Sequence, residues 1–286
     1  MRRLSQWLSN LSMIWAISCG MGHATPLCVP LSSPNTSQFS PGDVVILGEL
    51  HGSNESPDFL RKLICEELRE GRHVVVGLEA DTSLEGIVQS VDKESLSMAL
   101  RELEVHPFWN RPSGAQDGRT SFAMWSLWNA LIVRSVTDSN LTIQPIQPSL
   151  KHKSIEKFVA FLTKRSNSVG VILAGNMHTR LGFAKDLPEN INFFAAKTHV
   201  RLNVVSLMMA YSGGSVWRCG NPCGVGDVGM PDLGIVDVGA YLFNESPLGV
   251  DAGRLKALLP LAKLFSGIYW LDKVTPSFPF SPSLLK

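Results

Sequence analysis

The sequence predicts a three-layer α/β protein with a mainly parallel central sheet and helices on both of its faces. Short apolar, β-branched runs at residues 43–48 and 73–79 have the pattern of strands that are buried on both sides. A helical pattern separates them, and the same strand–helix–strand order recurs at residues 141–175. Because the two strands of such a unit lie parallel, two units predict a parallel sheet.

The helix between the first two strands has recognisable ends. Ser56 fits an N-cap, Pro57 the first helical position and Gly71 the C-terminal stop. The apolar residues between these ends fall on one stripe, which is expected to face the core: Phe59, Leu60, Leu63, Ile64 and Leu68.

The elements that follow are predicted in the same way. Residues 84–136 are interpreted as a helical insertion with a polar loop at residues 110–120, rather than as a separate domain. The later elements are a strand at 141–147, a helix at 154–164, strands at 169–175, 203–211 and 234–243, and a helix at 252–265 that Pro260 kinks or ends. The Gly- and Pro-rich residues 213–233 predict a loop, and three prolines in the last dozen residues predict an irregular tail.

Length and charge restrict the class of function. With 286 residues and 44% apolar residues, the chain can bury a large core, and residues 25–286 are expected to form a single domain. The formal charge of +1 provides no basic surplus for nucleic acid. Function is therefore expected at a local site that takes a small-molecule or peptide substrate.

The first 24 residues have the features of an export signal. Arg2 and Arg3 supply the positive end, residues 11–17 a short apolar stretch, and residues 22–24 a small-x-small cleavage site. This predicts a periplasmic or extracellular protein. Cys19 lies in a loose lipoprotein box, so membrane attachment is expected only if Cys19 is lipidated.

The four remaining cysteines suit an oxidising compartment. Cys219 and Cys223 flank a Gly-Asn-Pro turn and are expected to form a tight disulfide rather than half of a zinc site. Cys28 and Cys65 are the other candidate pair, and sequence reasoning leaves their pairing open.

Polar residues follow three of the predicted strands. The first strand ends in Gly48-Glu-Leu-His51 and is followed by Glu55; the second ends at Glu79, with Asp81 close behind; the third ends in Gly175-Asn176-Met-His178. Ligands gather at the carboxyl ends of parallel strands, so these side chains are expected at one edge of the sheet.

Two imidazoles beside carboxylates suit two kinds of chemistry. With Glu49, His51 and His178 could hold a divalent ion such as zinc, manganese or cobalt, which would acidify a bound water. Without a metal, one histidine takes a proton from water while the other polarises the substrate. The structural alternative is that the histidines are ordinary turn residues and that Glu49 or Glu55 caps the following helix.

The two Gly-x-x-His turns, within residues 47–55 and 173–178, resemble the paired motifs of the superfamily of ChaN-like haem-uptake proteins, Tiki and TraB proteins and erythromycin esterases. The resemblance covers residues 43–178. It implies a three-layer α/β fold whose site lies at these turns, with His51 and His178 activating water and Glu49, Glu55 and Glu79 supporting them. It also implies haem as an alternative ligand, although no tyrosine of this chain falls in a matching motif.

Residues 108–121 resemble a stretch of uncharacterised ChaN-like proteins in which an Asp-Gly-Arg turn opens a helix. This makes Asp117 and Arg119 candidates to line the pocket with Asn176, Arg119 as an anchor for a substrate carboxylate or phosphate. A structural Asp117–Arg119 salt bridge is an equal alternative. The leading hypothesis is an exported hydrolase of esters or peptides, and the alternative is a non-catalytic haem-binding protein.

Overall fold

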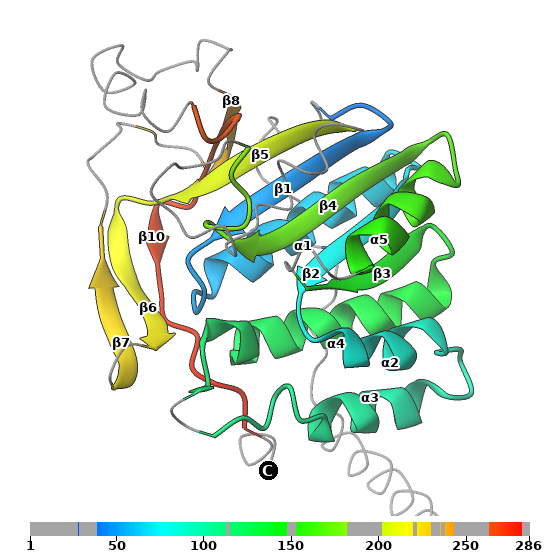
Figure 1. The fold of residues 1–286 in the computed structure, drawn as a ribbon, viewed down its shortest axis with the longest axis horizontal. Coiled ribbons are helices and arrows are strands. Elements are labelled where there is room, and N and C mark those ends of the chain that lie inside the picture. The colour runs from blue at the N-terminus through cyan, green and yellow to red at the C-terminus, as the bar shows by residue number, and fades with distance from the viewer. Residues whose placement is uncertain are drawn as a thin grey trace, which may run out of the picture.

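The computed structural model has the predicted three-layer α/β architecture (Figure 1). The structure describes residues 28, 39–112, 115–147, 153–181, 202–219, 222–229, 235, 238–242 and 263–281. The elements in chain order are β1 (Asp43–Glu49), α1 (Glu55–Arg69), β2 (His73–Glu79), α2 (Glu85–Gln89), α3 (Leu96–Val105), α4 (Phe122–Thr137), β3 (Leu141–Ile146), α5 (Ser154–Thr163), β4 (Ser168–Gly175), β5 (Asn203–Ala210), β6 (Gly213–Cys219), β7 (Cys223–Val228), β8 (Gly239–Leu242), β9 (Gly267–Trp270) and β10 (Lys273–Val274).

The central sheet has the strand order β3-β2-β4-β1-β5-β9-β8. Its neighbouring strands run parallel, apart from the antiparallel pair of β8 and β9. The strands of each predicted strand–helix–strand unit are parallel but are not neighbours, because β4 lies between β1 and β2, and β2 lies between β3 and β4. This interleaving brings the carboxyl ends of β2, β4 and β1 side by side.

Alternate residues of the strands face two separate apolar cores. Val45 and Leu47 of β1 pack on the face that α1 and α4 cover. Val44 and Ile46 point to the opposite face, where Phe158 of α5 packs (Figure 1). All residues of β1 are buried, as expected for a strand with helices on both sides.

The predicted start of the first helix is wrong by two residues. Helix α1 begins at Glu55 with Asn54 at the N-cap, and Ser56 lies inside the first turn, where its backbone N–H donates to Ser53 Oγ. The Asn54 amide makes no cap hydrogen bond and instead donates to Thr275 Oγ1 and the Pro276 carbonyl. A tertiary contact with the C-terminal segment therefore overrides the local capping signal.

The prediction of a loop at residues 213–233 is also wrong for most of that range. Strands β6 and β7 form an antiparallel hairpin that runs from the Gly214–Val228 pair to the Cys219–Cys223 pair, and β10 joins β6 to complete a three-stranded sheet. The glycines hide the alternation that marks a strand. Pairing with β10, burial of Val216 and the disulfide across the turn stabilise the hairpin instead.

The C-terminal residues are only partly as expected. Strand β8 covers four residues of the predicted strand at 234–243. Residues 252–262 of the expected helix lie outside the described residues, and residues 263–265 are not helical. The tail is irregular up to residue 281, but it is anchored by bridges from Pro276 to Ser53 and from Pro279 to Ser121, and Phe280 is buried.

Both cysteine pairs form disulfides, Cys28 with Cys65 and Cys219 with Cys223. Disulfides persist in oxidising compartments, so they indicate an extracellular or periplasmic location. The expected signal at residues 1–24 and Cys19 lie outside the described residues. Among the described helices, none combines the length and the apolar character needed to span a bilayer.

Candidate active site

The carboxyl ends of β1, β2 and β4 bring five of the predicted site residues together. Glu49 and Glu79 are the last residues of β1 and β2, and His51 and His178 follow the ends of β1 and β4. Arg119 reaches the same place from the turn before α4. Residues far apart in the sequence therefore form one polar cluster, because the parallel strands all end at this edge.

Glu79 is the centre of the cluster, and only 4% of its side chain is exposed. Its Oε2 accepts a 2.8 Å hydrogen bond from the Gly175 backbone N–H and lies 3.7 Å from His51 Nε2. Its Oε1 accepts a 3.0 Å hydrogen bond from Arg119 Nη1 and lies 4.0 Å from His178 Nε2. Burial works to raise the pKa of Glu79, but the two histidines, the Gly175 N–H and Arg119 together lower it, so the carboxyl is ionised.

His51 lies between two buried carboxylates. Its Nδ1 donates to Glu49 Oε1 at 2.7 Å, and its Nε2 faces Glu79. Burial opposes protonation of the ring and Arg119 adds a smaller opposing effect, but Glu49 and Glu79 outweigh both and raise the pKa of His51 to about 9. At neutral pH the ring is therefore an imidazolium, a hydrogen-bond donor at both nitrogens.

Arg119 is held by the protein's own carboxylates. Its Nε and Nη2 contact both oxygens of Asp117, while Nη1 binds Glu79. The predicted Asp117–Arg119 salt bridge thus forms, and it extends into the cluster. Since all three of its nitrogens are engaged, Arg119 serves in this arrangement as an internal link rather than an open anchor for a substrate anion.

Asn176 and Glu55 lie farther from the centre of the cluster than the histidines do, because their hydrogen bonds are with other groups. The Asn176 backbone N–H donates to the Glu49 carbonyl, and its side-chain Oδ1 is a buried atom without a hydrogen-bond partner among the described residues. The Glu55 carboxylate accepts hydrogen bonds from the backbone N–H and the hydroxyl of Thr275. Glu55 therefore ties the start of α1 to the C-terminal segment, and its expected support of the histidines is not seen.

Gly175 packs closely against the His51 ring. A Cβ atom at this position would lie 2.9 Å from His51 Nε2 and 3.5 Å from Glu79 Oε2. Its backbone N–H is already fixed on Glu79, so a side chain here would press on the imidazole. Glycine therefore allows the end of β4 to approach His51 and Glu79 this closely.

The described residues form no ready-made metal site of the kind that the sequence suggested. No group of three or more His, Cys, Asp or Glu side chains among the described residues could hold a metal ion. Both oxygens of Glu79 already accept hydrogen bonds, one of them from the cationic Arg119. We therefore derive no step through a metal.

The chain has three tyrosines that could in principle ligate haem iron, and two of them, Tyr211 and Tyr269, are buried. Tyr269 is fully buried with its hydroxyl 3.3 Å from Ser56 Oγ, and Tyr211 is 8% exposed. His152 and His199, two histidines that could also ligate haem iron, lie outside the described residues.

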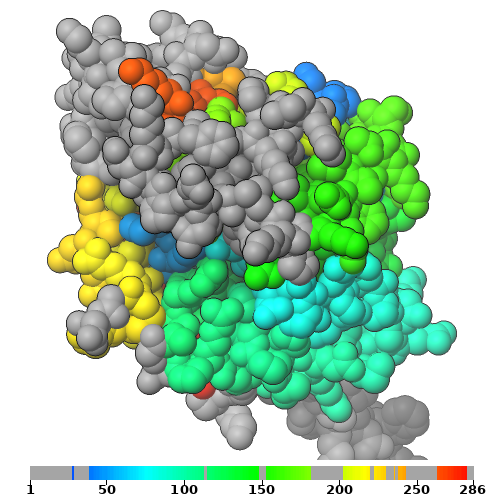
Figure 2. Space-filling model, in the orientation of Figure 1, coloured from blue at the N-terminus to red at the C-terminus, as the bar shows by residue number. Residues whose placement is uncertain are grey.

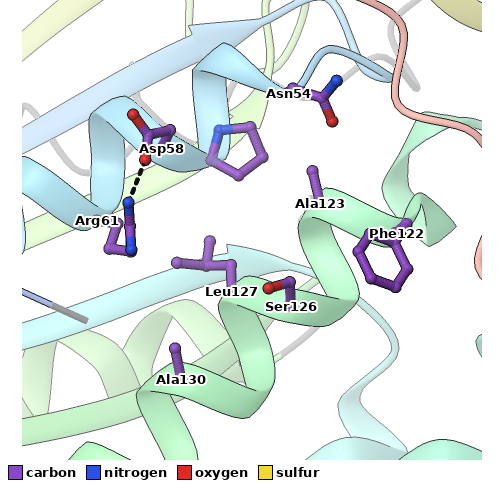
Figure 3. Close-up of a pocket in the computed structure, with 9 residues that line it drawn as sticks. Asn54, Asp58, Arg61, Phe122, Ala123, Ser126, Leu127 and Ala130 are labelled. Carbon is purple, nitrogen blue, oxygen red and sulfur yellow. Dashed lines mark hydrogen bonds and ion pairs between the residues drawn. The ribbon is translucent and has the colours of Figure 1, made fainter. Parts of the chain in front are cut away.

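A separate pocket of about 220 Å³ lies between α1 and α4 (Figure 3). Asp58 and Arg61 form an ion pair on its α1 side, and Phe122 and Leu127 line its α4 side. It contains no histidine, so it does not carry the chemistry of the strand-end cluster.

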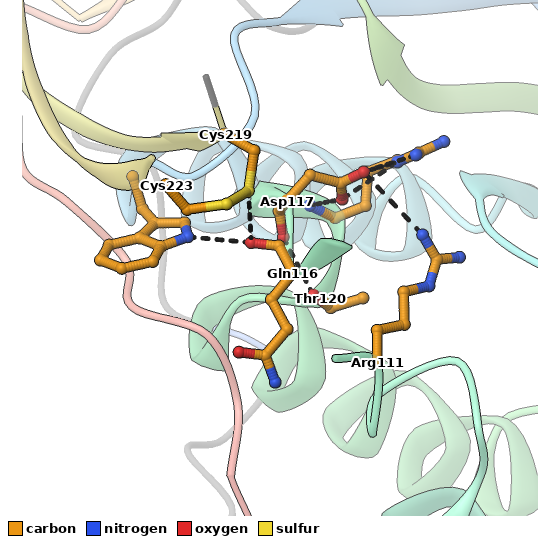
Figure 4. Close-up of a disulfide and its surroundings, with 8 residues drawn as sticks. Arg111, Gln116, Asp117, Thr120, Cys219 and Cys223 are labelled. Carbon is orange, nitrogen blue, oxygen red and sulfur yellow. Dashed lines mark hydrogen bonds and ion pairs between the residues drawn. A yellow bond between two sulfur atoms is a disulfide. The ribbon is translucent and has the colours of Figure 1, made fainter. Parts of the chain in front are cut away.

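Sequence reasoning missed the contribution of the β6–β7 hairpin. Trp217 of β6 donates its indole N–H to the Gln116 carbonyl, next to Asp117. Cys219 Sγ lies 3.2 Å from the same carbonyl, and Arg111 points toward Asp117 on the other side (Figure 4). The segment was interpreted as a loop, so no sequence signal placed Trp217 beside the site.

No protein-family model matches the chain, and no curated protein matches it significantly. The crystal structure of a Bacillus cereus protein superposes with a TM-score of 0.53 at 10% identity, over 88% of this chain and 96% of that one. The crystal structure of a succinoglycan biosynthesis protein gives a TM-score of 0.45 at 12% identity, over 88% and 95% of the two chains. At such identities, the first likeness shows a shared fold and nothing further.

Proposed function

We propose that this protein is an exported hydrolase of carboxylic esters or amides that uses a histidine pair to activate water. The observation that carries the proposal is that His51 Nε2 and His178 Nε2 face the two oxygens of one buried carboxylate, Glu79, at 3.7 and 4.0 Å. Two ring nitrogens that face one carboxylate can act on one substrate carbonyl and one water molecule.

The charge on His51 assigns that ring its role in the proposed reaction. His51 holds a proton between Glu49 and Glu79, so it acts as a donor toward the substrate carbonyl oxygen. His178 is left to take the proton from water as the water oxygen attacks the carbonyl carbon. The C–O or C–N bond then breaks, and the departing oxygen or nitrogen receives a proton from one of the two rings.

Three features support the proposal. His51 and His178 are only partly buried, with 23% and 31% of their side chains exposed, so a substrate can reach them. Gly175 has no side chain that would press on His51 Nε2. Both Gly-x-x-His turns resemble those of the superfamily that includes the erythromycin esterases and the Tiki proteins, for which water activation at these turns is implied.

The test is to measure hydrolysis of p-nitrophenyl acetate and of a panel of peptides by the chain without its expected signal, from pH 6 to pH 10. We expect His178→Ala and His51→Ala each to lower kcat/KM by roughly 100-fold, the usual size of general acid–base catalysis. Because His51 acts as the protonated partner, activity should fall as pH rises through about 9.

The control is His73→Gln. His73 begins β2 at the opposite edge of the sheet and binds Ser168 and Thr142, so its loss should leave turnover per folded molecule unchanged. Activity that is indifferent to both site substitutions would contradict the proposal. Activity that rises through pH 9 would reverse the roles given to the two histidines.

A further inference from the structure

Trp217 connects the two turns that carry the polar cluster. Its backbone N–H donates to the Gly52 carbonyl at 3.0 Å, directly after His51. Its indole N–H donates to the Gln116 carbonyl at 2.9 Å, directly before Asp117. One residue of β6 is therefore bonded both to the turn after β1 and to the turn before α4.

The two turns also touch each other through their backbones. A Cβ atom on Gly118 would lie 2.0 Å from the Gly52 N and 2.3 Å from the His51 carbonyl carbon. A Cβ atom on Gly52 would lie 1.9 Å from the Trp217 carbonyl oxygen. The three segments are thus packed without intervening side chains, so a shift of one is passed directly to the others.

Two further contacts connect the turn at Gln116 to Glu79 at the centre of the site. Asp117 binds Arg119 through both of its oxygens, and Arg119 binds Glu79 at 3.0 Å. Glu79 is the carboxylate that both histidines face. The Trp217 hydrogen bond therefore acts on the cluster through Asp117 and Arg119, without touching a reacting atom.

The Cys219–Cys223 disulfide closes the hairpin that carries Trp217. These cysteines are direct partners across β6 and β7, and Cys219 also contacts the Gln116 carbonyl (Figure 4). Cys219 is exposed, and the hairpin lies at one side of the molecule (yellow in Figure 2), so a dissolved thiol can reach this disulfide. Cys65 of the other disulfide is fully buried.

We propose that Trp217 is a positioning residue that holds Arg119 on Glu79, and that the Cys219–Cys223 disulfide keeps the hairpin, and hence Trp217, in the required place. This role rests on the proposed function, because Trp217 would keep the two histidines and Glu79 in their relative positions. Reduction by a dithiol, which transfers two electrons and two protons to the disulfide, would then loosen the site.

The test compares Trp217→Phe with the matched control Trp125→Phe in the full chain. Both indoles are half-buried beside a phenylalanine of the C-terminal tail, but the Trp125 N–H makes no hydrogen bond among the described residues. The readout is the NMR signal of the Arg119 Nη1 protons, which the bond to Glu79 protects from exchange with water.

We expect Trp217→Phe to speed exchange of the Arg119 Nη1 protons about tenfold, the effect of losing one hydrogen bond. Trp125→Phe should leave the exchange rate as in the wild type. If the protein hydrolyses esters, Trp217→Phe should also lower kcat about tenfold with little change in KM, since it displaces catalytic groups without removing a substrate contact. Equal Arg119 exchange in the two variants would overturn the proposal.

A second variant covers the case in which Trp217→Phe does not fold. Cys219→Ala combined with Cys223→Ala leaves Trp217 and the buried disulfide in place and should also speed Arg119 exchange. Unchanged exchange in this variant would contradict the role given to the disulfide. The exchange measurement needs no turnover, so a protein without hydrolytic activity would refute the proposed function while still testing this inference.

Discussion

At the scale of single residues, the chemistry of the site depends mainly on the ionisation of His51. An exposed histidine is mostly neutral at pH 7, but this ring has Glu49 at 2.7 Å on one nitrogen and Glu79 at 3.7 Å from the other. Two buried carboxylates without a cation between them would repel each other. The His51 imidazolium and Arg119 balance the charges of these two carboxylates. His51 is therefore protonated in the resting cluster and can act as the acid.

This ionisation predicts a loss of stability at alkaline pH. The pKa of His51 is about 9 in the folded protein and near its ordinary 6.5 in the unfolded chain, so folding favours the protonated ring. The stabilisation is complete below about pH 6.5 and is lost as pH rises through about 9. A shift of this size is worth at most about 3 to 4 kcal/mol. Urea denaturation at pH 7 and pH 10 measures it.

Glu49→Gln is the variant that isolates this effect. It keeps a group of similar size beside His51 Nδ1 but removes the charge, so the pKa of His51 should fall. The free energy of unfolding should then change less between pH 7 and pH 10 than in the wild type. An identical pH dependence in the two proteins would show that another group is responsible.

At the scale of elements, the site depends on turns that meet backbone to backbone. The turn after β1 and the Gly118–Thr120 turn before α4 approach so closely that a methyl group on Gly118 has no room. The neighbouring atoms belong to the backbone of His51 and Gly52 and cannot rotate away. Glycine is therefore required by the packing of two elements.

Gly118→Ala should destabilise the protein by about 2 kcal/mol or more, because the backbone of one turn must move. Gly86→Ala is the control, since nothing lies within 4 Å of a Cβ there, and alanine in helix α2 should be neutral or stabilising by up to about 1 kcal/mol. Thermal unfolding of the two variants measures the difference. Equal melting temperatures would contradict the close packing of the turns.

At the scale of the whole molecule, two disulfides act on different lengths of chain. Cys28–Cys65 joins residues 37 positions apart and ties the N-terminal segment to α1, whereas Cys219–Cys223 spans only four positions. A crosslink that closes a longer loop removes more freedom from the unfolded chain. Global stability should therefore depend mainly on the first disulfide.

Loop-closure entropy gives the expected sizes. Replacing Cys28 and Cys65 by alanine should lower the free energy of unfolding by about 4 kcal/mol, and replacing Cys219 and Cys223 by about 2 kcal/mol. Denaturant unfolding of the two double variants gives both values. A larger loss from the Cys219–Cys223 pair would mean that the hairpin contributes more to the fold than its short loop indicates.

Much of the fold could be predicted because the information is local. The apolar runs that became β1, β2 and β4 are continuous, and the stripe on α1 has a clear helical period. The convergence of His51 and His178 followed from the same pattern, because parallel strands end at one edge. The hairpin could not be predicted, since β6 and β7 are half exposed, rich in glycine and stabilised by β10 from the far end of the chain.

By itself, the sequence determined the α/β class, the parallel strands and the edge at which the polar residues gather, since these depend on residue types that lie close together in the chain. Only the tertiary structure decided the strand order, the turn of Glu55 toward Thr275, the engagement of Arg119 by Glu79 and the position of Trp217. Each of these is a contact between residues tens or hundreds of positions apart. Such contacts form only when the packing of the whole chain selects among many partners of similar chemistry.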